Sequence, residues 1–148
     1  MGIAGTGGGS SLVRFIDTNV LIYAASPSPG DAEKQRAAQR LLEAGELAVS
    51  VQVLQEFYHQ ATRATRPGAI AEDQALRFID SIGHFPVQDV TRDVFRTGVA
   101  ISRRFRLSYW DGAILAAAQV LGCDAVYSED LSDEQDYDGL RVHNPFTA

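Results

Sequence analysis

The chain has 148 residues, of which 45% are hydrophobic, and it carries 13 basic against 19 acidic side chains. This length fits one domain with a substantial core, and the single cysteine, Cys123, excludes an internal disulfide framework and a cysteine-rich zinc site. The net charge of -6 argues against a protein that holds nucleic acid by its overall field, so any such binding must rely on local arginines or on a metal.

The first eleven residues, MGIAGTGGGSS, are rich in glycine and serine and are interpreted as a flexible tail or a remnant of an expression vector. Residues 12–148 are expected to form a single domain. No apolar run approaches the roughly 20 residues that a membrane span needs, and no segment resembles a signal peptide. We therefore expect a cytoplasmic protein that has no membrane partner.

Strands and helices are predicted to alternate along the chain. Strands are expected at residues 13–16, 47–50, 85–90, 123–127 and 141–143. Helices are expected at residues 19–25, 31–44 with Asp31 as the cap, 52–65, 69–82, 91–105 and 108–121. This alternation favours an α/β fold in which a mostly parallel sheet of about five strands is covered by helices on both faces.

Four acidic residues interrupt apolar runs where the predicted strands give way to helices. They are Asp17 in FIDTNVL, Glu56 in VSVQVLQEFYH, Asp111 in LSYWDGAIL and Asp130 in AVYSEDL. A charge in apolar surroundings is costly unless a cation or hydrogen-bond donors compensate it.

Asp17 and Asp130 follow predicted strands, and open α/β sheets bind ligands at the carboxyl ends of their strands. Each also has a structural explanation. Asp17 could cap the next helix, and Asp130 could belong to a solvated acidic turn. That turn would comprise Glu129, Asp130, Asp133, Glu134, Asp136 and Asp138, which together account for the whole acidic excess of the chain.

Glu56 and Asp111 lie near the starts of predicted helices. The helical spacing places Glu56 with His59 and Arg63, where a solvated surface position is the ordinary explanation. Asp111 could form a capping box with Ser108, but it shares its helical face with apolar residues and should therefore point toward the interior or a cleft.

Two strand ends and two helix starts can meet at one edge of a parallel sheet, which would bring the four carboxylates together. Their mutual repulsion would then require cations. Oxygen ligands without histidine or cysteine favour Mg²⁺ or Mn²⁺, and the corresponding chemistry is hydrolysis of a phosphodiester by metal-activated water.

The segments FIDTNVLIYA, VSVQVLQEFYHQATR, LSYWDGAILAAAQVLGCDAVYSEDL and GLRVHNPF, in this order, resemble a PIN domain, specifically the VapC-type toxin ribonucleases of bacterial toxin–antitoxin pairs. The resemblance covers residues 13–146 and implies a three-layer α/β/α sandwich. It assigns the acidic quartet to Asp17, Glu56, Asp111 and Asp130. Thr18, Asn19 and Ser128 would support the quartet, the first and last as hydroxyls near the metal.

The same resemblance implies a Mg²⁺- or Mn²⁺-dependent endoribonuclease that acts on an RNA substrate, forms a homodimer and is inhibited by a cognate VapB-like antitoxin. Asp17, Asp111 and Asp130 would hold metal, and Glu56 would complete the site or orient the attacking water. One departure is Gly112, which follows Asp111 where such families commonly have alanine and which is expected to loosen the start of the helix.

Arginines near the quartet are candidates for RNA contact, although each could equally complement a helix dipole. They are Arg63, Arg66, Arg103, Arg104 and Arg106. Tyr109 and Trp110 could stack on bases, but an aromatic pair at the start of an apolar helix is more often core or dimer interface.

Three alternative functions are open at this stage. A phosphatase of the haloacid dehalogenase type is disfavoured, because Asn19 stands where that chemistry needs a second acid and Lys34 is the only lysine. A PIN-type DNA nuclease or RNA-processing factor is not separated from a toxin. A non-catalytic binding module of the same fold is disfavoured by the presence of all four acids.

Overall fold

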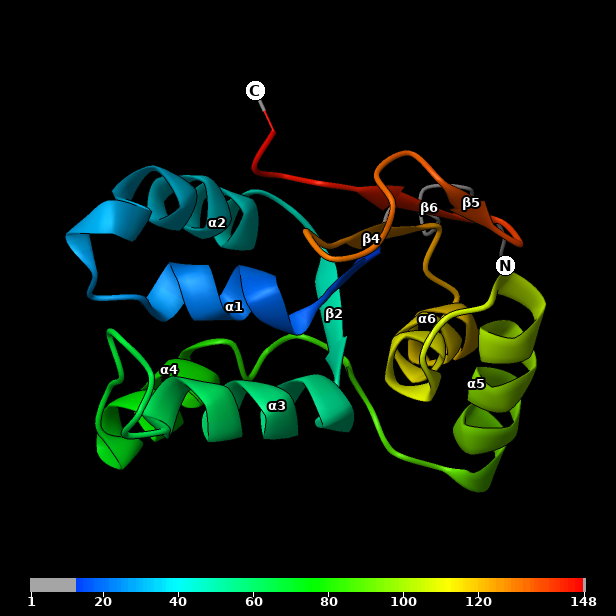
Figure 1. The fold of residues 1–148 in the computed structure, drawn as a ribbon, viewed down its shortest axis with the longest axis horizontal. Helices are drawn as coiled ribbons and strands as arrows, with labels where there is room; N and C mark the ends of the chain where they lie inside the picture. The colour runs from blue at the N-terminus through cyan, green and yellow to red at the C-terminus, as the bar shows by residue number, and fades with distance from the viewer. Residues whose placement is uncertain (1–12, 148) are drawn as a thin grey trace.

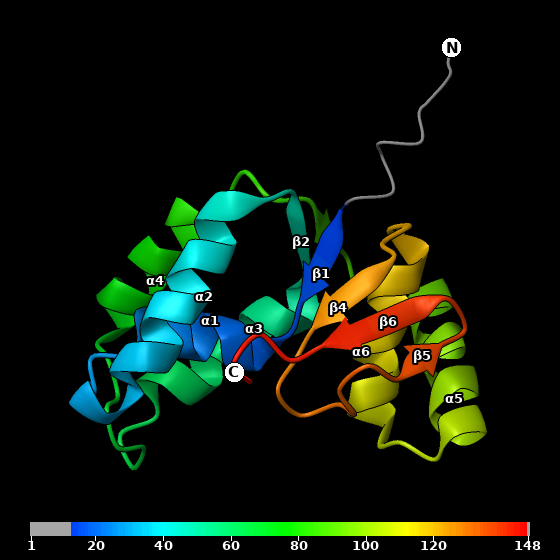
Figure 2. The same cartoon turned by 90° about the horizontal axis from the view of Figure 1, so that it is seen from above.

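A six-stranded sheet runs through the middle of the computed structural model, which describes residues 13–147 (Figures 1 and 2). Its strands are, in spatial order, β3 (Val87–Gln88), β2 (Leu47–Ser50), β1 (Arg14–Ile16), β4 (Ala125–Tyr127), β6 (Leu140–His143) and β5 (Asp136–Tyr137). All neighbours pair in parallel except β5, which is antiparallel to β6. The predicted N-terminal tail, residues 1–11, lies outside the described residues.

Helices cover both faces of this sheet. The described residues form α1 (Thr18–Ala25), α2 (Ala32–Ala44), α3 (Val51–Thr62), α4 (Glu72–Ser81), α5 (Arg92–Phe105), α6 (Tyr109–Val120) and a 3₁₀ turn, η3 (Pro29–Asp31). Helix α6 packs against β2, β3, β4 and β6, and α5 packs against α6. Helices α1 to α4 gather on the opposite side (Figure 2). The predicted α/β sandwich with a mostly parallel sheet is confirmed.

The central strands are buried because helices lie on both sides of them. Phe15 and Ile16 of β1 and Val126 of β4 have no exposed surface, and all four residues of β2 are buried. Leu115 of α6 is also fully buried and belongs to the same core. Within residues 13–147, no helix has the length and apolar character needed to cross a membrane.

The structure corrects several details of the sequence prediction; α4 and β3, for example, are shorter than the predicted ranges 69–82 and 85–90. A sixth strand, β5, was not predicted. Helix α3 ends at Thr62 and not at residue 65, because Arg63 is extended (φ -67°, ψ 119°) and turns the chain toward Pro67. Asp31 precedes α2, but its side chain makes no cap bond; its carboxylate accepts a hydrogen bond of 2.7 Å from the Ser26 hydroxyl.

Helices α5 and α6 cross so closely that two glycines are needed at the contact. A Cβ atom on Gly112 would lie 2.5 Å from the Gly98 carbonyl oxygen and 2.8 Å from Ser102 Cβ. A Cβ on Gly98 would lie 3.1 Å from Ala113 Cα. The glycine at position 112 therefore permits a close helix contact that a methyl group would block, a role that the sequence did not indicate, and the loosening of the helix start stays a prediction.

Candidate active site

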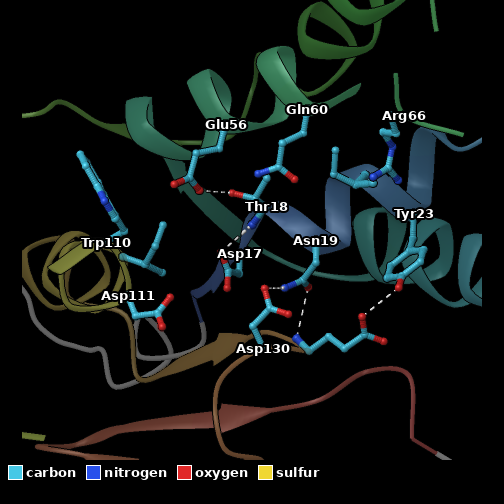
Figure 3. A pocket seen from close by; sticks show the side chains of 13 residues that line it. Asp17, Thr18, Asn19, Tyr23, Glu56, Gln60, Arg66, Trp110, Asp111 and Asp130 are labelled. Atoms are coloured by element: carbon cyan, nitrogen blue, oxygen red, sulfur yellow. Dashed lines mark hydrogen bonds between the residues drawn. The ribbon is translucent and has the colours of Figure 1, made fainter. Parts of the chain in front are cut away.

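The four predicted carboxylates line one pocket at the carboxyl edge of the sheet (Figure 3). Strands β2, β1 and β4 are parallel neighbours, so their carboxyl ends meet at this edge. Asp17 directly follows β1, and Asp130 lies in the loop after β4. Glu56 belongs to α3, which begins directly after β2, and Asp111 lies in the first turn of α6. The pocket has a volume of about 350 Å³, which is room for several waters or a phosphate group.

Asp17 is buried and is held by two hydrogen bonds. Its Oδ1 accepts from the backbone N–H of Thr18 at 2.7 Å, which caps α1, and its Oδ2 accepts from the Ser128 hydroxyl at 2.7 Å. The capping role weighed above is therefore present, and it coexists with a position in the pocket. Burial raises the pKa of Asp17 from 3.8 to about 6; the two hydrogen bonds oppose this shift, while the charges of Asp130 and Glu56 add to it.

Asp111 is partly exposed and points into the same pocket (Figure 3). Ser108 caps α6 because its hydroxyl accepts a hydrogen bond of 3.1 Å from the Asp111 backbone N–H. Partial burial raises the pKa of the Asp111 carboxyl, and the nearby charge of Asp130 adds to that effect. The pKa values of two of the four acids are thus raised, mainly because burial disfavours the charged form and in addition because the neighbouring carboxylates repel it.

Asn19 and Ser128 fix the loop that carries Asp130. Asn19 Nδ2 donates to Asp130 Oδ2 at 3.1 Å, and Asn19 Oδ1 accepts from the backbone N–H of Glu129 at 3.2 Å. The Ser128 hydroxyl oxygen also accepts from the backbone N–H groups of Asp130 and Leu131. Ser128 is fully buried, so this one side chain ties the loop after β4 to Asp17.

Glu129 also lines the pocket, but a cation compensates its charge. Its carboxylate pairs with Lys34 and accepts a hydrogen bond of 2.8 Å from the Tyr23 hydroxyl. The more distant acids of this segment do not line the pocket and bond elsewhere: Asp133 to the Asn144 N–H, Glu134 to His143, Asp136 to the Gly139 N–H and Asp138 to Arg104. The acidic-turn interpretation describes these residues, whereas Asp130 is turned toward the other pocket carboxylates.

Thr18 and Gln52 position Glu56 by hydrogen bonds, and of these two Thr18 was predicted from the sequence as a site residue. Its Oε1 accepts from the Thr18 hydroxyl at 2.7 Å, and its Oε2 accepts from Gln52 Nε2 at 3.2 Å. Gln52 also donates to the Trp110 carbonyl oxygen at 3.2 Å and so joins α3 to α6. Gln60 lines the pocket beside Glu56. Both glutamines lie four residues from Glu56, and this helical spacing was the signal for them.

His59 and Arg63, which the helical spacing grouped with Glu56, do not line the pocket, so Arg63 is not placed beside the carboxylates as an RNA contact. Both side chains are exposed to solvent. Arg63 lies beyond the last residue of α3, where the chain is extended, so the helical spacing no longer holds for it.

Among the arginines proposed for RNA contact, Arg66 lines the pocket and is the one basic residue that does so in the described chain. Arg103, Arg104 and Arg106 lie at the end of α5, where Arg104 pairs with Asp138 at 3.1 Å. Of these five arginines, only Arg66 therefore lies beside the carboxylates.

Arg106 ends α5 in the left-handed conformation (φ 57°, ψ 46°), which is unfavourable for any residue that has a Cβ. Replacing Arg106 with glycine is expected to raise the free energy of unfolding by about 1 kcal/mol, because glycine adopts this conformation without strain. Urea unfolding measures the effect. A lower urea midpoint for the variant would show that the guanidinium of Arg106 stabilises the fold by more than the backbone strain destabilises it.

The donor set of the pocket fits a hard divalent cation. It consists of oxygen ligands, and a buried carboxylate such as Asp17 is destabilised when charged unless a cation is nearby. As the side chains stand, residues 13–147 contain no group of three or more His, Cys, Asp or Glu side chains set closely enough to hold a metal ion. The carboxylates would have to draw closer together around an ion, and the half-buried Glu56 and Asp111 and the exposed Asp130 have room to do so.

Residues 14–132 match the sequence model of the PIN domain family, which covers most of the chain. The chain belongs to the PIN domain family. This membership confirms the PIN-like fold predicted from the sequence. No curated protein sequence matches the chain.

Several solved structures share this PIN fold. A chain of a toxin–antitoxin complex from Klebsiella pneumoniae is 23% identical, with a TM-score of 0.68 over 91% of this chain and 99% of that one. VapC20 of Mycobacterium tuberculosis, described as a sarcin–ricin loop cleaving toxin, is 20% identical, with a TM-score of 0.63 over 79% and 89%. A DNA-bound VapBC chain from Salmonella typhimurium is 18% identical, with a TM-score of 0.63 over 90% and 98%. Identities this low show a common fold.

Proposed function

We propose that this PIN domain is a metal-dependent endoribonuclease and the toxin of a toxin–antitoxin pair. The observation that carries the proposal is the pocket in which four carboxylates from separate elements converge, with the buried Asp17 at its base. Fold relatives that include a described RNA-cleaving toxin and chains of toxin–antitoxin complexes support the choice of RNA as substrate and of a VapB-like antitoxin as partner. A cytoplasmic site of action and a homodimeric assembly follow from the same relationship and remain part of the proposal.

Each residue of the pocket has its own role in this proposal. Asp17, Asp111 and Asp130 would hold Mg²⁺ or Mn²⁺, which when bound lowers the pKa of water and stabilises the charge that builds up on the phosphate. Glu56 accepts hydrogen bonds from Thr18 and Gln52, and it would orient the attacking water or complete the ligand set. Across the pocket, Arg66 would neutralise a phosphate of the substrate.

Ser128 and Asn19 would act as positioning residues. Ser128 directs Asp17 Oδ2, and Asn19 directs Asp130 Oδ2. Asn19 occupies the position that a haloacid dehalogenase would need for its second acid, and the only lysine, Lys34, is paired with Glu129. These contacts favour the nuclease over the phosphatase considered above.

RNA cleavage by wild type and by Asp111→Asn tests the proposal. Asp111 is the suitable position, because it is partly exposed and its replacement disturbs the fold little. With Mg²⁺ or Mn²⁺, we expect the variant to cleave about 10- to 100-fold more slowly, the usual range when a metal site loses part of its support. EDTA should abolish wild-type cleavage.

Asp89→Asn is the matched control, because Asp89 is an exposed acid outside the pocket. It should cleave as wild type does. Equal cleavage by wild type and Asp111→Asn would contradict the site assignment. Cleavage of DNA but not of RNA would favour a PIN-type DNA nuclease, and no cleavage of any nucleic acid by the folded protein would favour a binding module.

A further inference from the structure

The indole of Trp110 is exposed at the rim of the carboxylate pocket. With 63% of its surface accessible, it is the most exposed large hydrophobic side chain among the described residues. It lines the pocket and precedes Asp111 in the chain, so it stands beside two of the carboxylates, Asp111 and Glu56 (Figure 3). An exposed aromatic ring on the wall of a polar pocket is a candidate contact for a ligand that is flat and partly apolar.

Trp110 is held in this position from two sides. Its carbonyl oxygen accepts from Gln52, the side chain that also bonds Glu56. Its ring packs edge-on against Tyr109, with the ring centroids 5.1 Å apart, and Tyr109 in turn contacts Phe95. Because the backbone and one side of the ring are fixed, a ligand that packs on the indole would lose little side-chain entropy at this residue.

The negative charge of the protein means that a contact other than charge attraction must contribute to the binding of a polyanion. The chain carries a net charge of -6, and among residues 13–147 Arg66 is the one basic residue that lines the pocket. A polyanion therefore gains little from the overall field of the protein. Stacking of a nucleobase on an aromatic ring is independent of that charge and of base identity, so it can hold a single strand where phosphate contacts are few.

We infer that Trp110 is a stacking platform for an unpaired base next to the phosphate that enters the pocket. The inference rests on the proposed ribonuclease function and names the form of its substrate, a single-stranded segment of RNA. Trp110 thereby becomes a substrate-binding residue that places the strand, while the carboxylates act on the phosphate.

Trp110 is the only tryptophan in the chain, so its fluorescence reports directly on this contact. In EDTA, where no cleavage competes, we expect a short oligoadenylate to quench the fluorescence of the full-length protein. An abasic ribose-phosphate chain of the same length should leave it unchanged. Trp110→Ala should weaken oligoadenylate binding by about 5- to 100-fold, measured with a labelled strand, and Trp110→Phe should retain most of the affinity.

Val120→Ala is the matched control, because Val120 is exposed at the far end of the same helix and does not line the pocket. It should bind as wild type does. Quenching by the abasic chain, or equal affinity of wild type and Trp110→Ala, would overturn the inference even if RNA cleavage is observed. A fluorescence change that follows protein concentration, with a loss of dimer in Trp110→Ala, would also overturn it and assign the ring to a contact between copies.

Discussion

Replacing Asp17 with asparagine is expected to stabilise the metal-free protein at neutral pH while removing its nuclease activity. The pKa of Asp17 rises from 3.8 to about 6 in the folded protein, mainly because the carboxyl is buried. The stability that this group contributes is fully present below pH 3.8 and is lost as the pH rises through 6. Above pH 6, the ionised carboxylate costs on the order of 3 kcal/mol relative to the unfolded chain.

Asparagine removes that charge but keeps an oxygen that can accept from the Thr18 N–H. The amide cannot accept the Ser128 hydroxyl bond in the same way, so we expect a net gain of about 1–2 kcal/mol in the free energy of unfolding at pH 7.5. Urea unfolding in EDTA measures it. The gain should shrink as the pH is lowered toward 4, and a variant less stable than wild type at pH 7.5 would contradict the electrostatic account.

Mg²⁺ or Mn²⁺ should reverse the order of stability. An ion that binds only the folded wild type raises its melting temperature in proportion to the logarithm of the ion concentration, whereas Asp17→Asn should respond little. RNA cleavage by the same variant should fall by about 10- to 100-fold. A variant that gains stability and loses both the metal response and cleavage would show that Asp17 is retained for function at a cost to the fold.

Gly112→Ala is expected to lower the free energy of unfolding by about 3 kcal/mol, although alanine is the better helix former. The added methyl group would lie 2.5 Å from the Gly98 carbonyl oxygen, so α5 and α6 would have to move apart. Thermal or urea unfolding measures the loss. Because Asp111 precedes this residue, RNA cleavage by the folded fraction should also decrease.

Gly45→Ala is the control for this substitution. Gly45 lies after α2 in an extended conformation (φ -155°), and a Cβ there would meet no atom within 4 Å. The free energy of unfolding of this variant should differ from that of wild type by less than about 0.5 kcal/mol. Equal stability of the two variants would show that α5 and α6 can separate at little cost.

The sequence predicted five strands because each is an apolar run next to a turn or a helix signal. The sixth, β5, was missed because Asp136 and Tyr137 lie in a stretch of acids that suggested a solvated loop. A signal for this strand was nevertheless present in the sequence, because the pair Asp138-Gly139 is typical of the tight turn between two antiparallel strands. In the structure, both residues have the positive φ of such a turn, and it joins β5 to β6. The acidic composition of this segment therefore hid its turn signal.

The sequence could predict that the four acids lie at one edge of the sheet, because strand ends and helix starts are local features of a sequence. Asp17 and Asp130 follow strands that proved to be neighbours, and their meeting in one pocket is observed, although the catalytic roles remain a prediction. The bond from Gln52 to the Trp110 carbonyl and the pairing of Lys34 with Glu129 join residues far apart in the chain. No local pattern contains such contacts, because they depend on how α2, α3 and α6 are set around the sheet.

The close crossing of α5 and α6 restricts how this sequence can diverge. Gly98 and Ser102 occupy the space that any side chain at position 112 would need, so these three positions cannot change independently. A lineage that gains alanine at 112 must also alter its partners on α5 or accept a wider spacing of the helices. Because position 112 adjoins Asp111, a change in this helix contact would also shift the start of α6, which carries a carboxylate of the pocket.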